Sequence, residues 1–140
     1  METGCCEQRG AEYRPCVDAR ELGYETARCR PWLEAACERS GFGMCFSDLV
    51  ERLAYDNYRL WPGDKAAVVT EQIGDRMNLL LASGDYDELG VMSEVIGEYA
   101  KKQGIRQLII FARRGWERTF LKDQGYKARW TVMEKTLWAE

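Results

Sequence analysis

Hydrophobic residues between positions 30 and 55 recur at the three- and four-residue spacing of amphipathic helices. Pro31 suits the first turn of a helix, and Gly41 and Gly43 provide its end. The apolar face of this helix comprises Leu33, Ala36 and Cys37. Ser47 is the expected N-cap of a second helix, whose buried stripe comprises Leu49, Val50, Leu53 and Ala54. The pattern therefore predicts two consecutive helices.

The next part of the chain has the shorter apolar runs and turn residues of strands. Residues 58–61, 65–72 and 76–83 are the expected strands, and Val68 and Val69 lie at the centre of the second. The turns between them are short, at residues 62–64 and 74–75. Strands joined by such short turns are expected to form an antiparallel meander.

After residue 84 the spacing becomes helical again. Asp85 and Glu88 resemble a capping box, with Asp in place of Ser or Thr, and Gly104 ends the helix. The helical spacing is set by Leu89, Met92, Val95, Ile96 and Tyr99. Residues 108–112 form a continuous apolar strand, which is typical of a strand that is covered on both faces. A short helix over residues 116–124 and a long last strand over residues 126–137 are expected to follow.

Because a strand–helix–strand connection requires a right-handed crossover, the third and fourth strands should be parallel neighbours. The predicted fold class is α/β, with a mixed, mostly antiparallel sheet that helices flank and a parallel strand–helix–strand crossover. Residues 29–140 form the expected domain. Residues 1–28 have weak periodicity and many charges, so we expect an irregular N-terminal arm there.

Cysteine and histidine usage excludes the common zinc sites. The chain has 6 Cys and no His, all cysteines lie in the first 45 residues, and no two of them form a C-x-x-C pair. We therefore expect no metal. Cys29, Cys37 and Cys45 are interpreted as small buried hydrophobes, and Cys5, Cys6 and Cys16 as ordinary thiols of the arm.

Composition indicates a soluble globular protein of one domain, with 46% hydrophobic and 31% charged residues. No apolar run reaches the roughly 20 residues that span a bilayer, and residues 1–28 lack the apolar core of a signal peptide. A cytoplasmic location and no membrane partner are therefore expected.

The net charge of −3 is unevenly distributed, because residues 101–140 carry ten Lys+Arg against four Asp+Glu. Either these charges solvate separate faces, or the basic end contacts an acidic partner protein or nucleic acid. The chain has no recognisable nucleic-acid motif, so direct nucleic-acid binding is not expected.

The loop between the third strand and the long helix is acidic, with Asp85, Asp87 and Glu88 in its last four positions. A strand-to-helix junction is a natural anion site, because the first N–H groups of the helix have no partner within the helix. Here we expect the three carboxylates to satisfy the first helical turn from within.

The order of these elements resembles that of the Gcn5-related N-acetyltransferase (GNAT) family over residues 30–137. The most specific likeness is FLKDQGY at residues 120–126 followed by VMEK at residues 132–135, which resemble the family's LYxxxGF and xMxK patterns. The whole chain is also similar to small GNAT-like proteins encoded among the structural genes of tailed bacteriophages. That similarity is carried by RPWLEAA at residues 30–36, LWPG at 60–63, ASGD at 82–85 and RRGW at 113–116.

Two departures from the family's pattern count against catalysis. The resemblance implies that a Q/R-x-x-G-x-G/A loop would hold the pyrophosphate of acetyl-CoA, but the matching loop here keeps Gly84 and is otherwise acidic. In an active protein, the residues that would bind this cofactor are Ala82, Ser83, Gly84, Leu89 and Gly90. The general-acid tyrosine of the family is replaced by Leu121, which has no proton to donate. Glu71 is a conceivable base, although a solvated strand carboxylate explains it as well. We therefore assign no catalytic residue.

Arg113, Arg114, Trp116 and Arg118 form the candidate partner-binding cluster. Arginine and tryptophan are enriched at interface hot spots, although a solvated helix start with a buried tryptophan is the alternative. The sequence favours a catalytically decayed GNAT-like protein without cofactor, acting by contact with phage virion proteins or with itself. It would then lie in the host cytoplasm during assembly and in the virion. The alternatives are an acyl-CoA-dependent N-acetyltransferase with an atypical loop, which would use acetyl-CoA, and a host-directed inhibitor or regulator.

Overall fold

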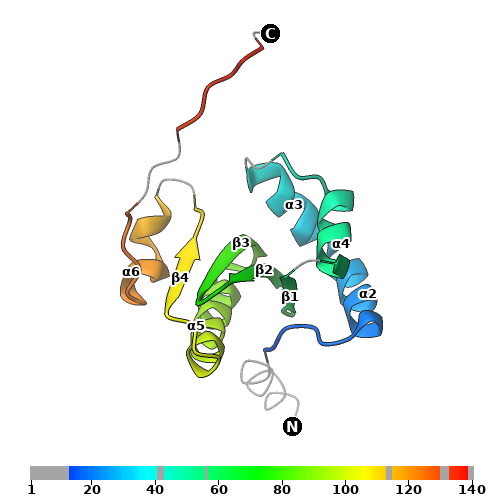
Figure 1. Ribbon diagram of the computed structural model, residues 1–140, viewed down its shortest axis with the longest axis horizontal. Coiled ribbons are helices and arrows are strands. Elements are labelled where there is room, and N and C mark those ends of the chain that lie inside the picture. The colour runs from blue at the N-terminus through cyan, green and yellow to red at the C-terminus, as the bar shows by residue number, and fades with distance from the viewer. Residues whose placement is uncertain (1–12, 41–42, 56, 113–114, 130–132, 139–140) are drawn as a thin grey trace.

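A computed structural model describes residues 13–40, 43–55, 57–112, 115–129 and 133–138. Its centre is a sheet with the strand order β1-β2-β3-β4 (Figure 1). The strands are β1 (Tyr58–Pro62), β2 (Ala66–Ile73), β3 (Arg76–Gly84) and β4 (Gln107–Ile110). The first three are antiparallel neighbours, and β4 is parallel to β3. The expected α/β fold, with its antiparallel meander and parallel crossover, is confirmed.

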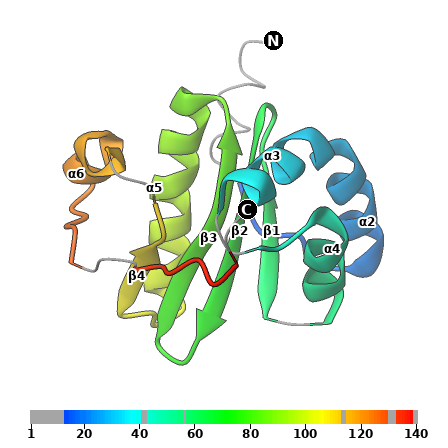
Figure 2. The same ribbon diagram turned by 90° about the horizontal axis from the view of Figure 1, so that it is seen from above.

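Helices cover both faces of the sheet (Figures 1 and 2). One face carries α2 (Ala19–Arg28), α3 (Arg30–Ser40) and α4 (Phe46–Tyr55). The other face carries α5 (Tyr86–Lys102), which connects β3 to β4. The 3-10 helix η1 (Trp116–Arg118) and the short α6 (Phe120–Asp123) follow β4.

Each face has its own apolar core. Leu33, Leu49 and Leu60 are almost completely buried between α3, α4 and the sheet, and Met92 and Ile96 of α5 are equally buried on the other side. The expected stripe of α4 is only half correct, because Val50 and Ala54 are exposed. Strand β4 is only partly buried, so the expectation that it is covered on both faces is wrong.

A β-bulge in β3 explains how one strand serves both cores. Val69 pairs with Leu81 and Thr70 pairs with Leu79, so Leu80 is an extra residue between the two pairs. Side chains of a strand alternate between the faces, and the extra residue reverses that alternation. Leu79 therefore packs on the α5 side, whereas Leu81 packs on the side of α2, α3 and α4.

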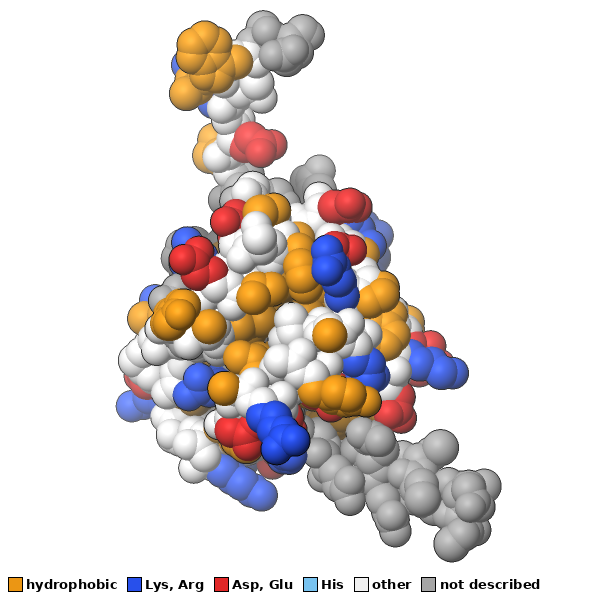
Figure 3. All heavy atoms as spheres, turned by 90° about the vertical axis from the view of Figure 1, so that its right-hand side faces the viewer, with side chains coloured by type: hydrophobic (Ala, Val, Ile, Leu, Met, Phe, Trp, Pro, Cys, Tyr) orange, Lys and Arg blue, Asp and Glu red, His pale blue; other side chains and the backbone are white. Residues whose placement is uncertain are grey.

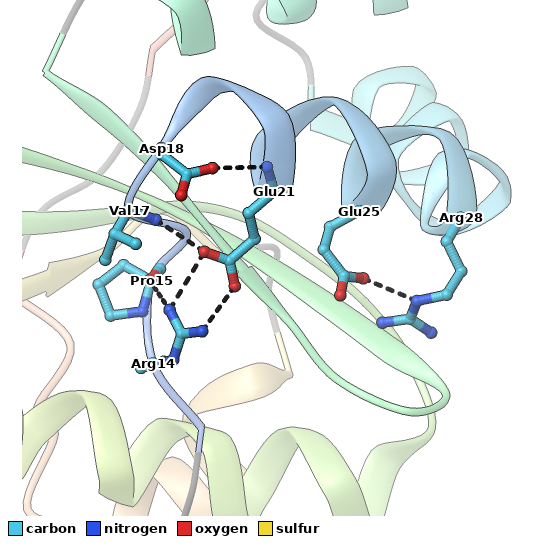
Figure 4. Close-up of polar contacts among 7 residues, drawn as sticks. All are labelled: Arg14, Pro15, Val17, Asp18, Glu21, Glu25 and Arg28. Atoms are coloured by element: carbon cyan, nitrogen blue, oxygen red, sulfur yellow. Dashed lines mark hydrogen bonds and ion pairs between the residues drawn. The ribbon is translucent and has the colours of Figure 1, made fainter.

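The segment before residue 29 is more ordered than the sequence analysis predicted. Residues 19–28 form α2, and the Asp18 carboxylate caps this helix by accepting a hydrogen bond from the Glu21 backbone N–H at 2.8 Å (Figure 4). Glu21 also forms an ion pair with Arg14 at 2.9 Å. The backbone N–H of Cys16 donates to the Leu60 carbonyl at 2.9 Å, which ties this segment to β1. The prediction of an irregular arm is wrong for these residues.

Four of the cysteines lie in the described residues. Cys29 and Cys37 are buried, as expected, but Cys45 is exposed and Cys16 is buried, contrary to expectation. Cys5 and Cys6 lie outside the described residues.

The expected last strand is not formed by the described residues of that region. Residues 126–129 and 133–138 have neither helix nor strand, and Met133 is 90% exposed, so its expected packing is also wrong. Trp130 and Val132 of that prediction lie outside the described residues. A strand requires a hydrogen-bonded neighbour, and in this structure the extended segment leads away from the sheet (Figure 1).

Candidate functional site

The junction between β3 and α5 is the place where the resemblance implies a pyrophosphate loop, and here it is bonded to the β1–β2 turn. The Asp85 carboxylate caps α5 by accepting a hydrogen bond from the Glu88 N–H at 2.9 Å. The Asp85 backbone N–H in turn donates to the Lys65 carbonyl at 2.9 Å. The junction is therefore attached to the neighbouring turn by its backbone as well as by its side chains.

Glu88 connects three parts of the chain. One of its carboxylate oxygens accepts from the Tyr13 hydroxyl at 2.6 Å and from the Asp64 backbone N–H at 2.7 Å. The other oxygen accepts from the Lys65 backbone N–H at 2.7 Å. These are short, charge-assisted hydrogen bonds. Two adjacent backbone N–H groups of the β1–β2 turn thus bind a carboxylate of the protein itself.

This arrangement corrects part of the prediction for the acidic loop. Asp85 does satisfy a free N–H of the helix, as expected. Glu88 instead turns sideways to the β1–β2 turn, and Asp87 is exposed. Only half of the predicted capping box is therefore present, because Glu88 does not reach back to the N–H of Asp85.

Gly84 is required by close packing of the backbone. Its φ of +124° is disfavoured for any residue with a Cβ, and a Cβ at this position would lie 2.3 Å from the Lys65 carbonyl oxygen. The backbone that approaches Gly84 is therefore β2 and the turn before it. This explains the glycine without a bound phosphate.

Aromatic residues join the start of α5 to α6. The ring of Tyr86 lies 5.1 Å from that of Phe120 and 6.3 Å from that of Trp116, measured between centroids. The Tyr86 hydroxyl also accepts a hydrogen bond from the Phe120 backbone N–H at 3.2 Å. Further along the helices, the Gln124 side-chain amide donates to the Gly90 carbonyl at 3.1 Å. This end of α5 is consequently packed against η1 and α6.

The residues that would bind the cofactor in an active protein have other contacts here. Ser83 is buried, and its hydroxyl accepts a hydrogen bond from the Arg39 guanidinium at 2.8 Å. Leu89 belongs to the core on the α5 side, and Gly90 faces the Phe120 ring. Ala82 and Gly84 are exposed at the end of β3. The side chains of Ser83 and Leu89 are therefore engaged within the fold.

The position where the resemblance implies a general acid is part of the core. Leu121 is buried, and its carbonyl accepts a hydrogen bond from the Tyr126 N–H at 2.9 Å. Burial raises the pKa of the Tyr126 phenol, whose hydroxyl has no hydrogen-bond partner among the described residues. A phenol with a raised pKa releases its proton less readily, so Tyr126 is a poor substitute for the missing acid.

The structure describes half of the expected partner-binding cluster. Trp116 is half-buried among the aromatic residues at the start of α5, and Arg118 is exposed in η1. Arg113 and Arg114 lie outside the described residues.

A groove that the sequence analysis did not identify lies on the opposite face of the sheet from α5. It has a volume of about 640 Å³ between α4 and the strands, and Glu71 and Asn78 form part of its floor. The sequence contained one signal for it, because Asn78 interrupts the apolar run at residues 77–82. Among the described residues, no group of three or more His, Cys, Asp or Glu side chains could hold a metal ion.

Comparisons with known proteins support the fold and leave the function open. No protein-family model and no curated protein matches the chain. The fold is similar to the crystal structure of the tetramutant of BH1408 protein from Bacillus halodurans, with a TM-score of 0.55 and 15% identity. That similarity covers 89% of this chain and 98% of the other. None of the helices formed by the described residues is long and apolar enough to cross a membrane.

Proposed function

We propose that this chain is a catalytically decayed GNAT-fold protein of a tailed bacteriophage, acting through protein contacts in the virion or its assembly. The observation that carries the proposal is the bonding of Glu88. In a nucleotide-cofactor protein, backbone N–H groups at the N-terminus of such a helix are left for phosphate oxygens. Here the Glu88 N–H at the start of α5 donates to the Asp85 carboxylate, and the Glu88 carboxylate is held beside it by the N–H groups of Asp64 and Lys65.

The negative charge of the junction also disfavours the binding of a phosphate. Asp85, Asp87 and Glu88 surround the start of α5. At 4 Å, one carboxylate repels one phosphate charge by about 1 kcal/mol in water and by about 4 kcal/mol at an effective dielectric constant of 20. Salt and side-chain rotation reduce this repulsion, but three carboxylates together disfavour a pyrophosphate. Buried Leu121 supports the same proposal, because it cannot protonate a leaving thiolate.

We propose the phage origin from the sequence resemblance. The same resemblance gives the proposed location, which is the host cytoplasm during assembly and then the virion. Protein contact is proposed because the basic end of the chain includes exposed Arg118 and half-buried Trp116 on one 3-10 helix. Arginine pairs carboxylates in bidentate geometry, so an acidic surface of a virion protein is the expected counterpart.

Incorporation into particles tests this function. The wild-type protein should be detected by mass spectrometry in purified particles. The triple charge reversal Arg113→Glu, Arg114→Glu, Arg118→Glu should abolish incorporation while the isolated domain remains folded. The matched control reverses three exposed basic residues elsewhere, Lys101, Lys102 and Arg106, and should be incorporated normally. Absence of the wild-type protein from particles and from assembly intermediates would contradict the proposal, and normal incorporation of the arginine variant would exclude this cluster as the contact.

A further inference from the structure

The β1–β2 turn binds an anion that belongs to the chain itself. On the face shown in Figure 3, acidic and basic side chains are interspersed, so the described side chains of that face form no single-sign patch for a charged ligand. At the turn, by contrast, three donors converge on the Glu88 carboxylate. They are the Tyr13 hydroxyl at 2.6 Å and the backbone N–H groups of Asp64 and Lys65, both at 2.7 Å. Successive backbone N–H groups of a turn form a concavity that binds anions.

The two backbone donors are held by bonds that do not involve the carboxylate. The Gly63 N–H donates to the Ala66 carbonyl at 2.8 Å, which closes the turn. The Arg28 guanidinium donates to the Gly63 carbonyl at 2.6 Å, and the Lys65 carbonyl accepts from the Asp85 N–H at 2.9 Å. The turn is therefore tied to α2 on one side and to the start of α5 on the other, and its N–H groups keep their direction without a carboxylate between them.

The third donor is also positioned by its own packing. The half-buried Tyr13 packs against the core on the α5 side, whereas Cys16 is buried in the core on the other side. The Cys16 N–H donates to the Leu60 carbonyl at 2.9 Å, and Arg14 pairs with Glu21 at 2.9 Å (Figure 4). The segment that carries the hydroxyl is thus fixed at several points, and none of these contacts involves the carboxylate.

The site has the size and charge that suit a carboxylate rather than a phosphate. One Glu88 oxygen accepts two of the bonds and the other accepts the third, so both oxygens of a planar group are used. A Cβ at Gly63 would lie 2.8 Å from a Glu88 carboxylate oxygen and 2.9 Å from the Met92 sulfur, so little space remains on that side. The Asp85 carboxylate, which accepts from the Glu88 N–H at 2.9 Å, repels a phosphate dianion more than a monoanion.

We propose that Tyr13 and the β1–β2 turn form a preformed carboxylate-binding site, which Glu88 fills as an internal ligand and which binds a free carboxylate when that side chain is removed. In the wild-type protein the Glu88 carboxylate is tethered beside its donors, so its effective concentration is high and a free carboxylate does not displace it. This inference does not depend on the proposed function, because it concerns neither acetyl-CoA nor virion proteins.

Thermal unfolding of the full chain with Glu88→Ala tests the inference, with acetate as the probe. With a dissociation constant of about 50 mM, sodium acetate at about 0.5 M should raise the midpoint of this variant by about 4 °C over sodium chloride of the same ionic strength. The wild-type protein and Glu94→Ala, an exposed position of the same helix, keep the Glu88 side chain and should show no such rise. If Glu88→Ala is unfolded in chloride, recovery of its helical circular dichroism in acetate is the equivalent result.

Removing one donor makes the test specific to this site. Tyr13→Phe, added to Glu88→Ala, deletes the hydroxyl and should weaken acetate binding about tenfold, so that most of the rise is lost. The control Tyr24→Phe, at a tyrosine of α2 that is 69% exposed, should leave the rise unchanged. The proposal would be overturned by a Glu88→Ala variant that acetate stabilises no more than it stabilises the wild-type protein, or by a response that Tyr13→Phe does not reduce. Phosphate that stabilises Glu88→Ala as much as acetate does would overturn it as well.

Discussion

Glu88 has the most informative contacts of any single residue described in this chain. Its two carboxylate oxygens accept three hydrogen bonds, from Tyr13, Asp64 and Lys65. These partners lie 75, 24 and 23 positions away in the sequence. The sequence alone showed an acid at the start of a helix and predicted a local capping role. It could not show that a distant turn would supply the donors, because that depends on how the strands pair.

Replacing Glu88 should reveal how much this bonding stabilises the fold. Glu88→Gln puts an amide N–H₂ group where a backbone N–H now donates, so at least one hydrogen bond to a charged acceptor is lost. We expect the free energy of unfolding to fall by about 1.5–3 kcal/mol in urea denaturation. Glu94→Gln, at an exposed position of the same helix, should change it by less than about 0.5 kcal/mol. Equal effects of the two substitutions would show that the Glu88 contacts contribute little.

The buried thiols of Cys16 and Cys29 should make the folded protein less stable at alkaline pH. Burial raises the pKa of Cys16 to about 12 and that of Cys29 to about 11, from an ordinary value of 9.0. Above about pH 9 the unfolded chain therefore releases these protons while the folded chain keeps them, so the free energy of unfolding decreases as pH rises.

The measurement is the slope of the free energy of unfolding against pH between about pH 8 and 10. The slope should be less steep in Cys16→Ala than in the wild-type protein. Leu49→Ala, a truncation in the same core without a thiol, should lower stability and keep the wild-type slope. A Cys16→Ala slope as steep as the wild-type slope would contradict this account.

At the scale of elements, the sequence predicted most helices and strands because their apolar spacing is strong. The positions of α3, α5 and the first three strands follow the prediction closely. Helix α2 was missed because Leu22 and Tyr24 are its only large apolar residues, too few to reveal a helical spacing in the sequence. A polar signal was present, since Asp18 and Glu21 have the spacing of a capping box. The last strand was predicted but is not formed by the described residues of that region. An alternating pattern indicates a strand, but it does not supply the neighbouring strand that a sheet requires.

The close approach of Gly84, at the end of β3, to the turn before β2 gives a prediction at the element scale. Gly84→Ala combines a positive φ with a Cβ 2.3 Å from the Lys65 carbonyl oxygen, so we expect a loss of more than about 3 kcal/mol in stability. Gly74→Ala is the matched control, because Gly74 also has a positive φ of 61° but has nothing within 4 Å of a Cβ. It should cost only about 1–2 kcal/mol. Thermal unfolding of both variants decides the question, and a Gly84→Ala variant that is no less stable than Gly74→Ala would show that the junction can relax.

At the scale of the whole molecule, the two faces of the sheet have different characters. On the α5 side, the junction where the resemblance implies a cofactor phosphate is bonded through Glu88 to the β1–β2 turn, and Tyr86, Trp116 and Phe120 pack together beside it. On the other side, a polar groove remains open. The fold class could be predicted from apolar spacing alone. The groove could not, because its lining residues come from α4 and from separate strands whose register the sequence does not state.

The affinity for acetyl-CoA tests the proposed function most directly. We propose that carboxylates of the chain itself occupy the place where a GNAT-like protein would hold the cofactor's phosphates. Titration calorimetry at low salt gives the most favourable conditions for weak binding of an anion. The account predicts a dissociation constant weaker than about 100 μM, which corresponds to roughly −5.5 kcal/mol. A dissociation constant below that value, with one cofactor bound per chain, would contradict it.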